Sequence, residues 1–219
     1  MAYEEWSRIV NIAFRGYSAA LLLLAVFFSG CGGSFQAGTD VDQGRQAMFR
    51  GDNQAALDYF AAAAKSDPSY VWGTELREGT LSFLGREQYL NGQLAPARET
   101  LQKALAQHQS DHLARLYLGL TLARQGDRKA GLSDIEAGLK GIRDFLNYIT
   151  TTFALSFGQF WDPGKAIRNS VDTNLAMIAK GNFDWPTLIA NSETIAMNFE
   201  QEPDNARQQQ EQQREMNLP

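Results

Sequence analysis

The two histidines of this chain, His108 and His112, are four residues apart, a spacing that can place both imidazoles on one helix to bind zinc. They flank Gln109-Ser110-Asp111, a predicted turn between two helices, so we expect surface histidines rather than a metal site. A single cysteine excludes an internal disulfide and any thiol-rich metal site. The sequence contains no nucleophile motif, no phosphate-binding loop and no glycine-rich dinucleotide fingerprint. We therefore expect neither a cofactor nor an enzyme.

The cysteine, Cys31, is the residue whose surroundings do indicate chemistry. It follows an apolar run from Ala19 to Phe28. That run is much shorter than the ~20 residues that span a bilayer. The segment Phe28-Ser29-Gly30-Cys31 resembles the signal of bacterial lipoproteins. The resemblance implies that residues 1–30 are a signal peptide, that the thiol of Cys31 receives a diacylglycerol, and that the new N-terminus is acylated after cleavage.

The same resemblance bears on localisation. In lipoproteins an aspartate after the cysteine favours retention in the inner membrane, whereas Gly32 stands here. The resemblance thus implies an outer-membrane protein that faces the periplasm. Phe28 in place of the usual leucine, and the acids Glu4 and Glu5 in the leader, depart from the pattern. An uncleaved signal anchor and a buried, unmodified cysteine are the alternatives. We expect residues 31–40 to form a linker.

Composition limits the class of partner. The chain has 219 residues, of which 44% are hydrophobic and 21% are charged, as in ordinary globular proteins. The net charge is −5, from 20 basic and 25 acidic residues. Phosphate binding requires clustered lysine and arginine, so we expect no nucleic-acid partner.

Glycines recur in pairs along the middle of the chain, which indicates an internal repeat. The members of a pair are seven residues apart, and the second and third pairs are offset by 34 residues. The first pair precedes the second by 41, which indicates an insertion at residues 71–77. The first glycine of each pair is expected where two helices cross closely, and the second where a helix ends with positive φ. The pairs are Gly44 and Gly51, Gly85 and Gly92, and Gly119 and Gly126.

Residues around these glycines resemble the tetratricopeptide repeat. Leu84-Gly85 and Leu118-Gly119 match its first helix, and Ala56, Phe60 and Pro68 match its second. The resemblance implies an all-α fold in which residues 41–145 form a right-handed superhelical array of antiparallel helix hairpins. The three hairpins are expected at 37–70, 78–111 and 112–145, with Phe60, Leu101 and Ile135 filling their interiors. A generic bundle of amphipathic helices is the alternative.

The resemblance also implies a protein-binding groove lined by the first helix of each hairpin. Arg45, Arg86 and Arg124 would form a basic strip there, suited to an acidic C-terminus or an extended peptide. The alternative is three ordinary solvated arginines. The full set of groove residues is Arg45, Met48, Phe49, Ser82, Arg86, Tyr89, Leu116, Leu120 and Arg124.

The repeat pattern fades beyond residue 145. We expect capping helices over 146–200, because a helical array needs a cover for its last apolar face. The aromatic residues at 153–161 are expected either in the core or in an exposed binding patch. The polar, glutamine-rich residues 201–219 are expected to be a frayed helical extension or a disordered tail.

Two classes of function follow. The first is a membrane-anchored periplasmic scaffold that binds protein partners and helps to assemble or tether an envelope complex. The second is a substrate- or ligand-binding lipoprotein of an envelope transport system. A large closed cavity lined by Phe153, Phe157 and Trp161 would favour the second class, and packed C-terminal helices beside an open groove would favour the first.

Overall fold

Helices make up most of this protein. The computed structural model describes residues 31–216, and these contain eight α-helices, so the expected all-α class is confirmed. A short antiparallel pair, β1 (Val71–Trp72) and β2 (Glu78–Gly79), and a 3-10 helix, η1 (Phe157–Phe160), complete the regular structure of this range. The helices are α2 (Cys31–Phe49), α3 (Asn53–Ser66), α4 (Thr80–Leu90), α5 (Leu94–Gln107), α6 (His112–Arg124), α7 (Arg128–Thr152), α8 (Ala166–Lys180) and α9 (Trp185–Met216).

The expected signal peptide, residues 1–30, lies outside the described part of the chain. Between residues 31 and 216, no helix combines the length and the apolar character that a bilayer crossing requires.

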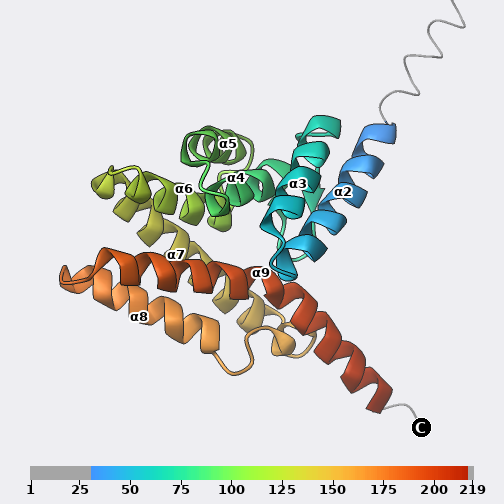
Figure 1. Ribbon diagram of the computed structural model, residues 1–219. Coiled ribbons are helices and arrows are strands. Elements are labelled where there is room, and N and C mark those ends of the chain that lie inside the picture. Colours follow the sequence, from blue (N-terminus) through green and yellow to red (C-terminus); the bar gives the residue numbers. More distant parts are fainter. Residues whose placement is uncertain (1–30, 217–219) are drawn as a thin grey trace, which may run out of the picture.

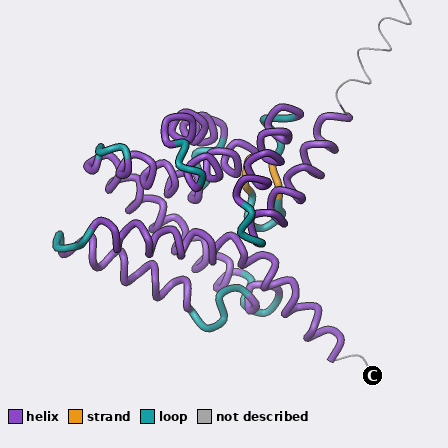
Figure 2. Tube along the Cα trace, viewed as in Figure 1, coloured by secondary structure: helices purple, strands orange, loops and turns teal. Residues whose placement is uncertain are grey.

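The first six helices form three successive hairpins, in which α2 packs on α3, α4 on α5 and α6 on α7 (Figures 1 and 2). Their positions agree with the predicted hairpins 37–70, 78–111 and 112–145, except at the two ends. Helix α2 begins at Cys31, so the residues 31–40 that we expected as a linker are helical. Helix α7 continues past residue 145 to Thr152.

Helix α2 starts early because its first turns pack against the end of α3. Ala37 and Val41 are fully buried. The hydroxyl of Ser34 donates a hydrogen bond of 2.6 Å to Asp67, and a Cβ on Gly33 would lie 2.9 Å from the carbonyl oxygen of Ser66. These tertiary contacts outweigh the poor helix propensity of the glycines and serine in this segment.

The paired glycines occupy the positions expected of them. A Cβ on Gly44 or Gly85 would lie 2.6 Å from the side chain of Phe60 or Leu101, respectively, the residues expected to fill those hairpins. In the third hairpin, a Cβ on Gly119 would lie 2.5 Å from the amide nitrogen of Ile135. The second glycines all have positive φ, with values of 77° at Gly51, 74° at Gly92 and 98° at Gly126.

The predicted insertion forms β1 and the turn that leads into β2. Trp72 pairs with Glu78 and Val71 with Gly79, and Gly73, with φ of 88°, allows the chain to reverse between the strands. The hairpin leads directly into α4, which starts at Thr80. It thereby brings Glu78 and Trp72 against the arginines of α2 and α4.

The C-terminal helices fold back over the array. Helix α9 runs beside α8 and crosses α7 (Figure 1), and it also contacts α6 and η1. Its side chains Leu188, Ile195 and Phe199 are buried. It does not end near residue 200 but continues through Pro203 to Met216. The tail is therefore a helical extension, and its beginning is packed, because Glu202, Pro203 and Ala206 are buried.

The aromatic cluster at 153–161 contributes to packing. The ring of Trp161 is buried and meets Phe145 edge-on, with 5.6 Å between the ring centroids. Phe153 stacks on Phe157 at 4.5 Å, and both are half-buried. Leu155, at the turn between α7 and η1, is the exception and is fully exposed.

Gly119→Ala tests the close helix crossing in the third hairpin. A Cβ there meets backbone atoms of α7, which cannot rotate away as a side chain can. We expect a loss of roughly 1–3 kcal/mol in the free energy of unfolding, measured by urea denaturation. The matched control is Gly164→Ala, since a Cβ at Gly164 has no heavy atom within 4 Å. An equal change in the two variants would contradict the crossing.

Candidate functional site

Two of the three arginines of the predicted groove are buried and paired with α9. Arg45, from α2, contacts Glu200 at 3.0 Å and Asp204 at 2.7 Å. Arg86, from α4, donates a hydrogen bond of 2.6 Å to Glu200 and lies 3.6 Å from Glu78. The exposed fractions of Arg45 and Arg86 are 4% and 1%. The interpretation of these two residues as solvated arginines is therefore wrong.

Aromatic rings enclose the two guanidinium groups. The Cζ atom of Arg45 lies 3.7 Å from the centroid of the Trp72 ring, and Arg86 lies 5.0 Å from that of Phe83. A cation over an aromatic face is attracted by the ring quadrupole, which partly replaces lost hydration. The β1–β2 hairpin supplies Trp72, so the insertion contributes directly to this site.

The third arginine, Arg124 from α6, has a different setting. It is exposed, and its Cζ atom lies 4.8 Å from the centroid of the Tyr89 ring. The hydroxyl of Tyr89 donates a hydrogen bond of 2.5 Å to Glu193 of α9. Helices α2, α4 and α6 thus turn one common side toward α9, and we call this side the first-helix face.

The other predicted groove residues also belong to the first helices, but most are not accessible. Ser82, Leu116 and Leu120 are buried, and Met48 is half-buried. Phe49 remains exposed, at 37%. Ser82 interacts with Asp111 and Leu116 lies against Gly138, both inside the array. Helix α9 covers Arg45, Arg86 and Tyr89, so only part of the expected groove faces it.

Sequence reasoning missed the acidic partners of these arginines. Glu193 and Glu200 are seven residues apart on α9, and Asp204 follows after four more. Such spacing puts carboxylates on one face of a helix, which was the available signal. Glu78 lies on β2, just after the insertion, where no helical period could have assigned it to the core.

Acids outnumber bases in this buried region. Glu78, Glu87 and Asp111 are also buried, and the carboxylate oxygens of Glu78 and Glu87 have no hydrogen-bond partner in the described part of the chain. Burial raises the pKa of Glu87 to about 7, although the Arg86 guanidinium offsets part of the rise. Burial likewise raises the pKa values of Glu78 and Asp111. The region is therefore short of positive charge.

A cavity of about 400 Å³ lies between the first-helix face and α9. Its size is in the range of small-ligand sites. Helices α2, α4 and α6 and the α2–α3 turn supply one wall, and α9 supplies the other. Its lining consists of Met48, Gly51, Asn53, Arg86, Leu90, Tyr117, Ala190, Glu193, Thr194, Met197 and Glu200.

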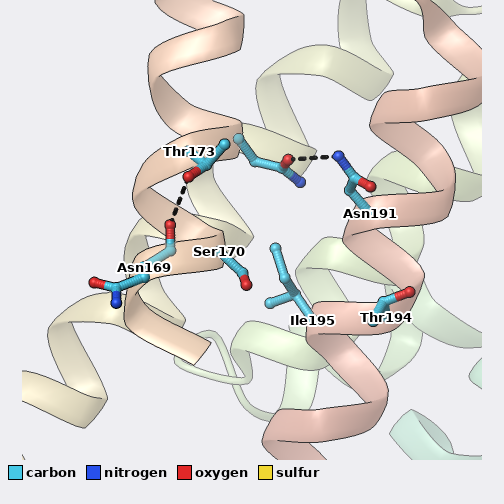
Figure 3. Close-up of a pocket in the computed structure, with 7 residues that line it drawn as sticks. Asn169, Ser170, Thr173, Asn191, Thr194 and Ile195 are labelled. Atoms are coloured by element: carbon cyan, nitrogen blue, oxygen red, sulfur yellow. Dashed lines mark hydrogen bonds between the residues drawn. The ribbon is translucent and has the colours of Figure 1, made fainter. Parts of the chain in front are cut away.

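A second cavity, of about 300 Å³, lies between α8 and α9 and is polar (Figure 3). Its lining includes Asn169, Ser170, Thr173 and Asn191, and contains no charged side chain. Asn191 donates a hydrogen bond of 3.2 Å to the buried Asn174. The hydroxyls of Ser170, Thr173 and Thr194 donate to backbone carbonyls four residues earlier in their own helices. These amides and hydroxyls provide no acid or base at neutral pH.

The histidine pair and the cavity beside Trp161 lie outside the linings of these two cavities. His108 ends α5 and His112 begins α6, so the two histidines do not share a helix. Between residues 31 and 216, no group of three or more His, Cys, Asp or Glu side chains is placed to bind a metal ion. The cavity beside Phe157 and Trp161 has a volume of about 40 Å³, room for about one water molecule.

No family model and no curated protein matches this sequence.

Glu87→Gln tests whether the buried region lacks positive charge, through the pH dependence of the protein's stability. Folded Glu87 holds its proton up to a pKa of about 7, against an ordinary value of 4.5. The folded protein therefore loses stability from this group as pH rises through that window. At pH 8 we expect the free energy of unfolding of the variant, measured by urea denaturation, to be roughly 1–3 kcal/mol higher than that of the wild type. Most of this difference should vanish at pH 5.

The control for this experiment is Glu99→Gln, which makes the same charge change at an exposed position on α5. It should change stability little at either pH. A stability difference for Glu87→Gln that is the same at pH 5 and pH 8 would contradict the raised pKa.

Proposed function

We propose that this protein is a lipid-anchored scaffold of the bacterial cell envelope that binds protein partners and is not an enzyme. Its hairpins form a right-handed superhelical array of the tetratricopeptide type. The observation that carries the proposal is that the first-helix face already binds a helix, its own α9, through carboxylates on arginines and through apolar contacts. Binding a helix in a groove is a common mode of protein recognition.

The partner meets the surface that α9 leaves open. Phe49 and Met197 are exposed, at 37% and 56%. Phe49 lies beside Arg45, Met197 lines the 400 Å³ cavity, and Arg124 is exposed over the Tyr89 ring. These side chains supply apolar and basic contacts along the edge of α9. The partner belongs to an envelope complex, because the anchor at Cys31 keeps the protein at the membrane.

The alternative is a substrate- or ligand-binding lipoprotein of an envelope transport system. The small cavity beside Phe157 and Trp161 gives this alternative no support at the place where we expected it. The 400 Å³ cavity against α9 is the observation in its favour. We prefer the scaffold, because α9 covers the buried charges and the C-terminal helices pack onto the array.

The lipid anchor predicts a labelling result. Cells that express the protein and grow on an alkyne analogue of palmitate should incorporate label into the wild type, because Cys31 and the new N-terminus carry acyl chains. Cys31→Ser should lose the label and leave the membrane fraction, since stable anchoring needs more than one acyl chain. An unlabelled wild type, or a labelled Cys31→Ser, would overturn the anchor.

The scaffold predicts a crosslinking pattern. A photo-crosslinking amino acid at position 49 or 197 should yield one discrete protein adduct in intact cells, because both positions border the first-helix face. The matched control is position 59 on α3, whose tyrosine is also 37% exposed. The absence of an adduct from positions 49 and 197, or the same adduct from position 59, would reject this face as the interface.

A further inference from the structure

The 400 Å³ cavity against α9 has more acid than base in its walls. Glu193 and Glu200 line it, and Arg86 is the one basic side chain in its lining. Glu200 and Glu78 already pair with Arg86 and offset its charge, although its Nε atom has no hydrogen-bond partner in the described part of the chain. Beyond the lining, Arg45 pairs with Glu200 and Asp204.

Glu193 is the carboxylate with capacity left for a ligand. The Tyr89 hydroxyl donates to its Oε1 atom at 2.5 Å. No donor from residues 31–216 pairs with its Oε2 atom, and the side chain is half-buried rather than solvated on all sides. An acceptor held in this way at a cavity wall can bind a charged donor strongly. Arg124 lies over the Tyr89 ring and also interacts with the Tyr89 hydroxyl.

The ring of Tyr117 lines the same cavity. Burial raises the pKa of Tyr117, the Arg86 guanidinium lowers it, and the carboxylates of Glu87, Glu193 and Glu78 raise it. Glu87 is fully buried beside Arg86 and has no hydrogen-bond partner in the described part of the chain. An added cation would compensate these carboxylates.

The remaining walls suit an aliphatic stem. Met48, Leu90 and Met197 present flexible, apolar side chains around the acidic end of the cavity. A methionine wall can adapt to stems of different shape. The cavity thus combines an apolar passage with an acidic, aromatic end.

We propose that this cavity binds an ammonium or guanidinium group carried on an aliphatic stem. Glu193 accepts a hydrogen bond from the group, and the face of Tyr117 and the carboxylate of Glu200 complete its surroundings. In the scaffold, the group is a lysine or arginine side chain of the partner, and this identification rests on the proposed function. The cavity would bind a free polyamine by the same chemistry.

Methionine-methyl NMR of the full-length chain tests the assignment. Met48 and Met197 line the cavity, whereas Met177 and Met216 do not, so the protein carries internal controls. N-acetyl-lysine N-methylamide should shift the first two methyl signals and leave the other two in place. N-acetyl-norleucine N-methylamide, which keeps the stem and lacks the charge, should bind at least about tenfold more weakly.

Two isosteric variants assign the contact. Glu193→Gln keeps an acceptor for Tyr89 and removes the charge, so it should weaken binding of the lysine compound about tenfold. Glu211→Gln makes the same change on an exposed part of α9 and should leave binding unchanged. No shift of Met48 and Met197 with lysine compound or spermidine, equal binding of the norleucine compound, or unaltered binding by Glu193→Gln would overturn the proposal.

The affinities of spermidine and of the lysine compound, compared with each other, identify the source of the cation. Tighter binding of spermidine than of the lysine compound identifies a free amine as the ligand, and the reverse order identifies a partner side chain. If the cavity binds a cation but no crosslinked adduct forms, the cation site stands and the proposed scaffold function is rejected. If an adduct forms but the cavity binds no cation, the scaffold function stands and the proposed cation site is rejected.

Discussion

The pairing of Arg86 with Glu200 is the interaction on which the rest of the structure depends. Arg86 lies on α4 and Glu200 on α9, 114 residues later, and both are almost completely buried. The same Glu200 binds Arg45 on α2, so one carboxylate connects the first hairpin, the second hairpin and the last helix. Loss of one member of such a buried group leaves an uncompensated charge, at a cost of about 3–5 kcal/mol.

Local and long-range contacts have separate roles in this fold. Each hairpin is built from neighbouring helices joined by turns of a few residues, and the glycines of the crossings fix how closely those helices approach. None of these contacts determines how the array is closed. Closure comes from α9, whose buried Leu188, Ile195 and Phe199 anchor it while its carboxylates reach the first-helix face.

The sequence was sufficient to predict the repeated hairpins. It was not sufficient to predict the contacts between segments that are far apart in the chain. Three glycine pairs sufficed for the hairpins, because helix crossings and helix ends have local residue requirements. The partners of Arg45 and Arg86 could not be found in the same way, since no periodicity relates α9 to α2 or α4. Residues 31–40 were expected to form a linker, and the contacts of Gly33 and Ser34 with Ser66 and Asp67 make them part of α2 instead.

Helix α2 begins at Cys31 itself, which has a consequence for orientation. Ser34 and Gly33, within one helical turn of Cys31, already contact the end of α3. If Cys31 carries acyl chains, the body of the protein therefore stands directly on the lipid headgroups, within about 5 Å of its anchor by the helical rise of 1.5 Å per residue. In that case the protein could not move away from the membrane surface as a domain on a flexible linker does. Segment 66–70 would face the bilayer, and partners would have to be brought to the protein within a thin layer at the membrane surface.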